Sequence, residues 1–552
     1  MTDSPLVLGP MLRYVDETSA AVWVETRDTA TVVVGAVGRS WSARTFAVHG
    51  HHYALVYVDG LTPGSVAEYS VTVNGVGAWP HPGSGFPASV IATLDAGRQL
   101  RMSFGSCRTS VPHDKTGTRT HGVDALRAFA FQLSADDSVR PDLLLFLGDQ
   151  VYADSTSAAM KEFIESRRDI KQPPGAELAD YEEYAHLYNL AWSDEANRWL
   201  MSTVPTAMIF DDHDIRDDWN ASVSWKRDME RKPWWQGRIV AGLASYWVYQ
   251  HLGNLSPAER AVDPMWRLIA SHHDEAELDL SDAIDVFADR ADKEPTSYRW
   301  SYCRDISDVR VIMLDSRAAR ELDPEHRSIV DAEEMEWLDA TLTGGFRHVL
   351  LGSSLPFLLP TGLHHLEAWN EAISQGAWGR VPAWLGERLR RGLDLEHWAA
   401  FQNSFRQVAG MLTEVADGKR GAAPQTVTIL SGDVHFSYVS EVDRSTGSRI
   451  IQAVCSPIRN PLARWLRSFT ALVSYGIAAG LSGRLSRAAG VQAPPFAWSG
   501  LKGPWFDNCL AVLTDTPGGL QLRWMSGVES SKDDGQPGVK DVVAVTVLPR
   551  SR

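Results

Sequence analysis

The sequence predicts a mixed α/β protein in which an all-β region precedes an α/β core. The 552 residues are more than one ordinary hydrophobic core accommodates, so two or more domains are expected. Up to about Ile91, short runs alternate apolar and polar side chains between turn residues. From about Arg98 onward, short apolar runs alternate with longer helical patterns, as in α/β cores. We therefore expect domains at residues 1–97 and 98–552.

The first region is predicted to be a β-sandwich. The runs Ala20–Glu25 (AAVWVE) and Tyr69–Val73 (YSVTV) have strand patterns, and Asn74-Gly75 supplies a tight turn. The phrase LTPGSVAEYSV resembles the turn-then-tyrosine pattern of fibronectin type III and related sandwiches. A stretch rich in Pro and Gly, Trp79–Pro87, is expected to form the linker to the second region.

Pattern and helix-breaking residues place the elements of the second region. Two helices are predicted at Met160–Arg168 and Tyr181–Leu200, with a break at Pro173-Pro174-Gly175 between them. Short apolar runs predict buried strands at Thr206–Phe210, Val309–Leu314 and Val349–Leu351. Turn residues around Pro517 predict a hairpin with strands Cys509–Thr514 and Gly519–Trp524.

Five apolar runs of the second region end in small, acidic or metal-competent residues. They are Arg101–Arg108 (RMSFGSCR), Leu143–Asp154 (LLLFLGDQVYAD), Thr206–Asp214 (TAMIFDDHD), His348–Pro356 (HVLLGSSLP) and Val427–His435 (VTILSGDVH). In sheets fed by helical crossovers, ligands bind where the carboxyl ends of strands meet their loops. The Cys, Asp, Tyr and His side chains at these ends can hold two metal ions and a proton donor, which predicts an active site.

Asp149 and Tyr152 form the first candidate ligand pair. At its strand end, Asp149 has two carboxylate oxygens with which to bridge two cations, and Tyr152 can turn back as a phenolate. An ordinary turn is the alternative for this GDxxY motif alone. Cys107, after another strand, is either a thiolate ligand or a small apolar filler, and Arg108 beside it can bind an anionic phosphate.

The DDHD and GDVH motifs supply further candidates. Asp212 can bind metal while the adjacent His213 faces a substrate and donates a proton to its leaving group. A helix N-terminus rich in Asp is the alternative, and Asp217 shortly beyond is another oxygen ligand. Asp433 and His435 point to the same side of an extended segment, because side chains alternate there with a period of two. This spacing suits a two-residue metal clamp.

Composition limits the class of protein. Hydrophobic residues at 44% and charged residues at 22% are typical of a globular protein. The net charge of −16 argues against a nucleic-acid backbone as the main partner, because such binding relies on Lys and Arg. The four Cys residues have no CxxC spacing and do not predict a disulfide framework. Many of the 21 Trp residues fall between residues 192 and 247, where we expect them to pack helices around the core, with stacking on a ligand as the alternative.

The lack of a recognisable export signal or membrane-spanning run predicts a cytoplasmic location. The N-terminus, MTDSPLVLGPML, has no basic region, long apolar region or twin-Arg motif, and no run approaches the roughly 18–20 apolar residues of a membrane span. The stretch Arg459–Arg487 is amphipathic, and it either covers the active-site cleft or lies on an anionic membrane surface. Its apolar positions are Leu462, Trp465, Leu466, Phe469, Val473, Ile477 and Leu481, interleaved with Arg464, Arg467, Arg484 and Arg487.

The order of these motifs resembles that of the alkaline phosphatase D (PhoD-like) family. The motifs are Ser106-Cys107, GDxxY, DDHD, the Gly-Ser-Ser strand end and SGDVH. That family is a divergent branch of the calcineurin-like metallophosphoesterases. The resemblance spans nearly the whole chain, and the LDSR at the end of Val309–Arg317 is similar to the LDTR of that family. It implies an α/β/β/α phosphoesterase core after a fibronectin-like sandwich.

The resemblance also implies a binuclear or trinuclear metal site. The implied ligands of an Fe³⁺-type ion are Cys107, Asp149, Tyr152 and His435. The implied ligands of a Ca²⁺-type ion are Asp149 and Asp433, together with Asp212 or Asp217. Mn²⁺, Mg²⁺ and Zn²⁺ are alternatives. His213 would be the catalytic histidine, and Arg108 and Arg317 would bind the phosphate. Asp214 and Asp217-Asp218 stand where the family commonly has Glu and Asn, so the oxygen ligands depart from its pattern.

The expected function is metal-dependent hydrolysis of phosphate mono- or diesters, of the alkaline phosphatase/phosphodiesterase type. In-line attack by a metal-bound hydroxide is the expected mechanism. A phospholipid phosphodiesterase that docks through residues 459–487 is one alternative. A catalytically silent metal-binding scaffold is another. The sequence leaves the ester preference, the identity of the metals and the oligomeric state open.

Overall fold

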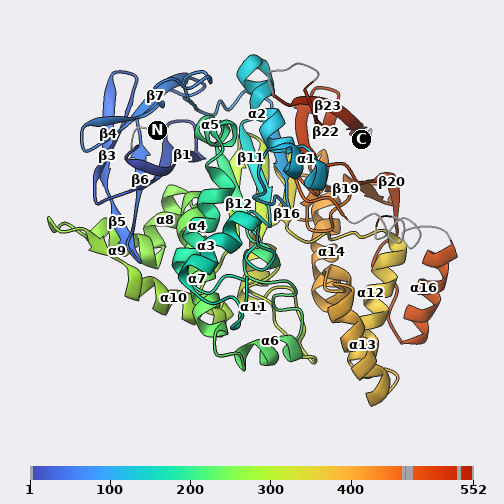
Figure 1. The fold of residues 1–552 in the computed structure, drawn as a ribbon. Helices are drawn as coiled ribbons and strands as arrows, with labels where there is room; N and C mark the ends of the chain where they lie inside the picture. Colours follow the sequence, from blue (N-terminus) through green and yellow to red (C-terminus); the bar gives the residue numbers. More distant parts are fainter. Residues whose placement is uncertain (1–3, 463–466, 468–476, 531–535, 550–552) are drawn as a thin grey trace.

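The computed structural model describes residues 4–462, 467, 477–530 and 536–549. In Figure 1 the N-terminal strands lie on one side of two central sheets, and helices surround these sheets. The fold is mixed α/β with an N-terminal all-β region, as the sequence predicts.

Two sheets form the N-terminal β-sandwich. One has the order β1 (Leu6–Val15), β2 (Ala20–Thr26), β6 (His51–Val58) and β5 (Phe46–Val48), with β13 (Leu278–Asp279) at its edge. The other has the order β4 (Arg39–Arg44), β3 (Thr31–Ala36), β7 (Val66–Val73) and β8 (Val76–Trp79). Strand β9 (Val90–Ala92) also pairs with β7.

The sandwich packs directly against the helices that follow it. On β2, Val22 and Val24 point into the sandwich interior, whereas Ala21 and Trp23 join a core shared with the helices. Strand β2 is therefore buried on both faces, because its side chains alternate between two cores.

Two larger sheets form the α/β core. The six-stranded sheet has the order β12 (Thr206–Ile209), β11 (Leu143–Leu147), β10 (Arg101–Gly105), β21 (Cys509–Thr516), β22 (Gly519–Val528) and β23 (Gly538–Val547). The seven-stranded sheet has the order β14 (Tyr302–Ile306), β15 (Val309–Leu314), β16 (His348–Ser353), β17 (Thr426–Ser431), β19 (Arg449–Val454), β18 (Ser437–Val442) and β20 (Trp498–Trp505). Strands β10, β11 and β12 are mutually parallel, and so are β15, β16, β17 and β19.

The two sheets face each other and bury a common core. Along β11, Leu143, Leu145 and Leu147 point into the core between the sheets. Leu144 and Phe146 alternate with them and pack against the helices outside. Leu350 of β16 belongs to the same inter-sheet core. The α/β/β/α layering follows from this alternation.

Helices cover the outer face of each sheet. Those packed in the core outside the six-stranded sheet include α2 (Ala125–Ala135), α3 (Ala158–Arg167), α4 (Tyr181–Trp192), α5 (Glu195–Thr203), α7 (Trp235–Tyr246) and α10 (Ser281–Lys293). Outside the seven-stranded sheet lie α11 (Ala332–Thr341) and α14 (Gln402–Ala416). Shorter helices are α1 (Lys115–His121), α6 (Val223–Glu230), α8 (Pro257–Val262) and α9 (Pro264–Ser271).

Three further helices form what we call the helical lobe. They are α12 (Thr361–Ser374), α13 (Arg380–Gly392) and α16 (Ile477–Ala488), and both α13 and α16 pack against α12. Figure 1 shows them side by side at the lower right of the molecule.

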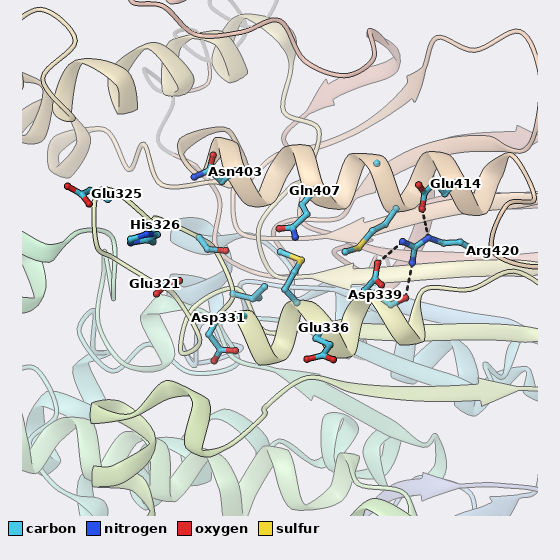
Figure 2. A pocket seen from close by; sticks show the side chains of 16 residues that line it. Glu321, Glu325, His326, Asp331, Glu336, Asp339, Asn403, Gln407, Glu414 and Arg420 are labelled. Atoms are coloured by element: carbon cyan, nitrogen blue, oxygen red, sulfur yellow. Dashed lines mark hydrogen bonds and ion pairs between the residues drawn. The ribbon is translucent and has the colours of Figure 1, made fainter.

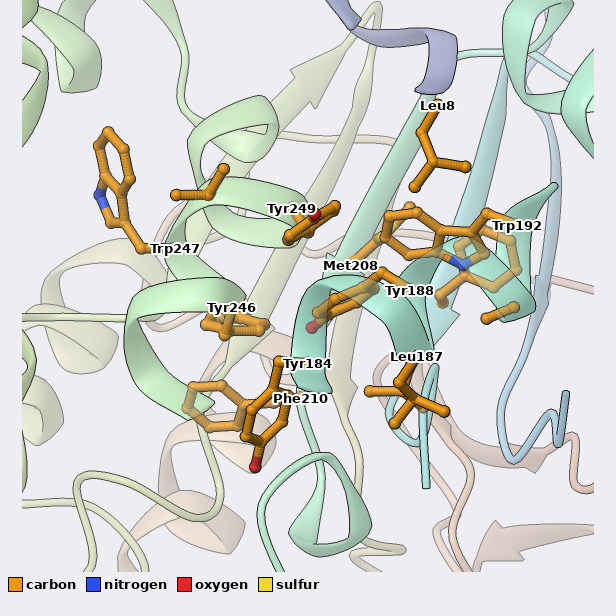
Figure 3. Close-up of a cluster of buried hydrophobic side chains, with 14 of the residues drawn as sticks. Leu8, Tyr184, Leu187, Tyr188, Trp192, Met208, Phe210, Tyr246, Trp247 and Tyr249 are labelled. Atoms are coloured by element: carbon orange, nitrogen blue, oxygen red, sulfur yellow. The ribbon is translucent and has the colours of Figure 1, made fainter. Parts of the chain in front are cut away.

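The tryptophans between residues 192 and 247 pack the helical core, as predicted. Trp192 lies beside Tyr188 of α4 and Tyr249 of the turn after α7, and Trp247 is buried in the same core with its ring pointing away from them (Figure 3). The rings of Tyr188 and Tyr249 stack with centroids 4.2 Å apart. Burial of most of these rings supports a packing role.

The prediction of one helix over Tyr181–Leu200 is wrong. Helix α4 ends at Trp192, and α5 begins at Glu195. The side chain of Asp194 accepts a hydrogen bond from the Asn197 amide and so caps a new helix.

The amphipathic stretch Arg459–Arg487 is described only in part. Its positions at 463–466 and 468–476, among them Trp465 and Phe469, lie outside the described residues. Its last part forms α16, which packs against α12, and Trp378 donates a hydrogen bond to the Ala488 carbonyl. Among the described residues, no helix has the length and hydropathy that crossing a bilayer requires.

Candidate metal centre and active site

The predicted side chains meet where parallel strands end. Three overlapping groups have ligand atoms within 4.8 Å of one another: Cys107, Asp149 and His435; Asp149, Asp212 and His213; and Asp211, Asp212 and Asp433. They follow β10, β11, β12 and β17, which belong to both central sheets. Asp149 belongs to two groups, in keeping with its predicted bridging position.

Four of these residues have a left-handed backbone. The φ angles are 58° at Cys107, 50° at Asp149, 64° at Asp433 and 56° at His435. Such conformations cost roughly 1–3 kcal/mol each and persist where surrounding structure imposes them. Here the Cys107 amide donates to the Gly148 carbonyl over 3.3 Å, so that adjacent strand ends hold each other.

Glycine is required before two of the aspartates. Gly148 has a φ of +104°, and a Cβ there would lie 2.6 Å from the Cβ of Asp211. A Cβ on Gly432 would lie 2.1 Å from the Ser106 hydroxyl oxygen. The Gly-Asp pairs of the motifs thus let the loops after β11 and β17 approach their neighbours closely.

Two side chains lie close to Asp149: Cys107, which precedes it in the sequence, and Tyr152, which follows it. The Tyr152 hydroxyl donates to Asp149 Oδ2 over 3.2 Å and lies 3.5 Å from His435 Nε2. Burial, reinforced by Asp149, raises the pKa of both the Tyr152 phenol and the Cys107 thiol well above their usual values. Burial also lowers the pKa of His435 to about 4, which keeps its ring neutral and able to bind a metal.

The centre holds more buried carboxylate than its cations balance. Asp149 Oδ1 and Asp211 Oδ2 are buried without a hydrogen-bond partner among the described residues. Burial raises the pKa of Asp149 well above its usual range, and the neighbouring Asp211 and Asp212 raise it further. Unpartnered buried carboxylate oxygens, next to thiol, phenol and imidazole donors, fit divalent or trivalent metal ions.

Arg317 lies inside this acidic cluster instead of facing an open site. Its guanidinium pairs with Asp211 and Glu396, and its Nη2 lies 3.0 Å from Asp212 Oδ1 and 3.5 Å from Asp433 Oδ1. The side chain is fully buried. The placement supports a role in holding the carboxylates and does not support the predicted contact with substrate.

Arg108 also binds other protein groups and does not face the acidic cluster. Its Nε donates to Asp124 Oδ2 over 2.9 Å, and its Nη1 donates to the Ala191 carbonyl over 2.7 Å. Only 3% of the residue is exposed. The expectation that Arg108 binds phosphate has no support in this geometry, because the guanidinium faces α2 and α4 rather than the cluster.

His213 is oriented by Asp154, which the sequence analysis did not select. His213 Nδ1 lies 2.9 Å from Asp154 Oδ1, and Asp154 also accepts the Asp217 amide over 2.6 Å. Burial lowers the pKa of His213, but the Asp154 and Asp212 carboxylates outweigh it and hold this pKa well above its usual value. The position of Asp154 in the same loop as Asp149 was the available signal.

Asp214 and Asp217 have different surroundings from Asp212. Asp214 Oδ2 accepts the amides of Asp149 and Asp211 over 3.0 and 2.9 Å, and so braces the two loops. Asp217 belongs to a separate group with Asp218 and Asp394. Of the two predicted alternatives, Asp212 is therefore the one that groups with both Asp149 and Asp433.

A loop after α13 contributes residues that no strand-end pattern indicated. His397 Nε2 lies 2.8 Å from Asp433 Oδ2, and its Nδ1 lies 2.7 Å from Glu367 Oε1 on α12. Glu396, beside it, pairs with Arg317 and Arg320. The sequence offered no regular signal for them, because they follow a surface helix.

A cavity of about 670 Å³ lies away from this centre, between α11 and α14. Figure 2 shows that its lining is largely acidic and that Arg420 pairs with Asp339 and Glu414 there. None of the candidate ligands lines it. The cavity is therefore separate from the candidate metal ligands.

Two stacked sheets thus carry candidate metal donors at their strand ends. The family model described as PhoD-like phosphatase matches residues 125–464, more than half of the chain. The chain belongs to the PhoD-like phosphatase family, which places it among the metal-dependent phosphoester hydrolases. Residues 3–91 match a second model, described as Domain of unknown function (DUF7800).

The structure of PhoD shares the fold, and a second solved structure also matches. The structure of PhoD is 13% identical with a TM-score of 0.57, and the match covers 99% of this chain and 94% of that one. Purple acid phosphatase PPD1 from yellow lupin (Lupinus luteus) seeds is 11% identical with a TM-score of 0.48, covering 97% of this chain and 74% of that one. A comparison with curated proteins found no match.

Proposed function

We propose that the chain hydrolyses phosphate mono- or diesters at the centre around Asp149. The observation that carries the proposal is that two metal-competent groups meet at Asp149, a buried carboxylate with one oxygen that has no partner among the described residues, and that a third group shares Asp212 with one of them. Bound cations would neutralise the ester's charge and lower the pKa of a water molecule for in-line attack on phosphorus.

The donor set supports two kinds of metal position. Thiol, phenol and imidazole groups of Cys107, Tyr152 and His435 beside Asp149 suit an Fe³⁺-type ion. Asp149, Asp212 and Asp433 offer only carboxylate oxygens, which suit Ca²⁺, Mg²⁺ or Mn²⁺.

His213 is the proposed general acid. Asp154 fixes its Nδ1, which leaves Nε2 to hold a proton for the leaving oxygen of the ester. The raised pKa of His213 keeps the ring protonated for that role. Arg317 holds Asp211, Asp212 and Asp433 in place without touching the substrate.

The first test compares metal content of the wild type and Asp149→Ala. We expect about one iron and one or two oxygen-liganded cations per chain, lost together in the variant because Asp149 contributes to both positions. Hydrolysis of p-nitrophenyl phosphate and bis(p-nitrophenyl) phosphate should fall with the metal content, and the ratio of the two rates assigns the ester preference.

Asp331→Asn is the matched control. Asp331 is a buried aspartate that caps α11 outside the centre, and Asn preserves the cap. This variant should keep both metal and activity. A wild type that holds no stoichiometric metal after supplementation, or an active Asp149→Ala, would contradict the proposal, and metal without hydrolysis would favour a silent scaffold.

A further inference from the structure

Helix α13 presents an exposed apolar face at the tip of the helical lobe. Val381, Trp384 and Leu385 are 70%, 55% and 53% exposed, and Trp378 just before the helix is 43% exposed. The spacing of i, i+3 and i+4 puts the three helical residues on one face. Single exposed apolar side chains are ordinary, but a contiguous set of large ones marks a contact surface.

Exposed arginines lie on α13 itself and on α16 of the same lobe. The Arg388 guanidinium lies 3.9 Å from the centroid of the Trp384 ring, and Arg380 begins the helix. Arg484 and Arg487 are exposed on α16 in the same lobe. In the part of the chain that the structure describes, none of these four arginines pairs with a carboxylate. The lobe is thus locally basic in a chain whose net charge is −16.

The face is already formed and rigidly held. The Asn370 side chain of α12 donates to the Gly386 carbonyl over 2.9 Å, and a Cβ on Gly386 would lie 2.7 Å from the Ser374 hydroxyl. Arg391 pairs with Asp228 of α6 over 2.8 Å. Close packing of one side of α13 therefore fixes its other side outward, so that docking needs no folding step.

We propose that the outer face of α13 docks this protein on an anionic phospholipid bilayer. Trp is favoured at the bilayer interface, and Val and Leu beside it would enter the acyl boundary. The arginines would meet lipid phosphates, whose negative charge complements the lobe and repels the rest of the acidic chain.

The position of the face links docking to the catalytic centre. Asp394 follows the end of α13 by two residues and groups with Asp217 and Asp218 beside His213. A docked α13 would thus bring Asp394, and with it the Asp217 side chain beside His213, toward the membrane surface. This last consequence rests on the proposed function, whereas the docking itself does not.

Vesicle co-sedimentation of the full chain tests the proposal. The wild type should bind phosphatidylcholine vesicles that contain phosphatidylglycerol, and should bind pure phosphatidylcholine weakly. Added salt should weaken the binding because it screens the arginines. The double variant Trp384→Ser/Leu385→Ser should lower the partition coefficient about tenfold or more, and Arg380→Gln/Arg388→Gln should remove the preference for the anionic lipid.

Val286→Ser is the matched control, because Val286 is also 70% exposed on a helix, α10, outside the lobe. It should bind like the wild type, and circular dichroism should confirm that every variant is folded. A wild type that ignores anionic vesicles, or a Trp384→Ser/Leu385→Ser variant that still binds them, would overturn the proposal. A wild-type dimer that this variant dissociates would overturn it too, since a second copy would then cover the face.

Hydrolysis of a soluble ester keeps the two proposals separable. The α13 variants should retain the wild-type rate on p-nitrophenyl phosphate. A fully active wild type that does not bind anionic vesicles refutes docking alone, and a wild type that binds vesicles without hydrolysing the ester refutes the proposed function alone.

Discussion

Charge balance governs the chemistry of single residues at this centre. Asp149, Asp211, Asp212 and Asp433 lie together, and Arg317 is the arginine that reaches three of them. Burial makes each uncompensated carboxylate costly, since charge in a low-dielectric interior needs a partner. The uncompensated carboxylates therefore favour the binding of cations at the strand ends. The loops hold these ligand residues in a strained, left-handed backbone conformation.

His397 is expected to position Asp433 for metal binding. Its Nε2 contacts Asp433 Oδ2, and Glu367 holds its other ring nitrogen. Loss of such a support typically lowers metal affinity 10–100-fold, roughly speaking, because the ligand loses its fixed orientation. Calorimetric titration of metal-free His397→Ala with Ca²⁺ should show this loss.

Two comparisons make that test specific. His397→Gln can still donate to Asp433 and should recover part of the affinity. His273→Ala, at an exposed site in another loop, should bind Ca²⁺ like the wild type. Equal affinity of His397→Ala and the wild type would show that Asp433 needs no such support.

At the scale of elements, the break between α4 and α5 determines that α5 packs against the sandwich strand β1. The chain between α4 and α5 reverses at Ser193 and Asp194, so α5 packs against the sandwich strand β1 instead of continuing α4. Asp194 also pairs with Arg127 of α2, which ties this reversal to a neighbouring helix.

The cap of α5 should stabilise the folded state measurably. Asp194→Ala removes the acceptor for the Asn197 amide and the pair with Arg127, so the free energy of unfolding should fall by about 1–2 kcal/mol. Asp194→Asn keeps the cap and loses only the charge, and it should lie close to the wild type. Urea denaturation measures both, and equal losses in the two variants would assign the effect to the ion pair.

At the scale of the whole molecule, the sandwich is fastened to the helical layer by histidine–carboxylate pairs. His49 Nε2 lies 2.9 Å from Asp285 of α10, and His51 Nε2 lies 3.0 Å from Glu182 of α4. The rigid attachment is completed by the shared apolar core that contains Trp23.

The attachment through His49 should depend on pH. The hydrogen bond to Asp285 raises the pKa of His49 above its usual value, despite opposing burial and His51. A raised histidine pKa stabilises the folded state fully below the unfolded-state pKa of about 6.5, and this contribution disappears as pH rises through the folded-state pKa. The wild type should exceed His49→Gln in stability by less than about 1 kcal/mol at low pH.

Thermal unfolding of both proteins between pH 5.5 and 9 checks the sign. The two melting curves should converge as the pH rises, because His49 loses its charge. A gap that widens with increasing pH would contradict the assignment of His49 as the charged partner of Asp285.

The sequence by itself determined the class of fold and the core of the candidate site. Apolar runs that end in Gly-Asp or Asp-His are local patterns, and parallel strands carry such ends to one edge. These patterns pointed to Cys107, Asp149, Tyr152, Asp212, His213, Asp433 and His435. The predicted clamp of Asp433 and His435 on an extended segment is wrong, because both residues have a left-handed backbone and they belong to different groups.

Only the tertiary structure decided which partners these residues have. Arg108 and Arg317 look alike in sequence as phosphate ligands, yet one faces Asp124 and the other is enclosed by the acidic cluster. His397 reaches Asp433 from a loop far along the chain, and Asp154 turns back onto His213. Charge pairing over long sequence separations depends on how layers pack, and a one-dimensional pattern carries no record of that packing.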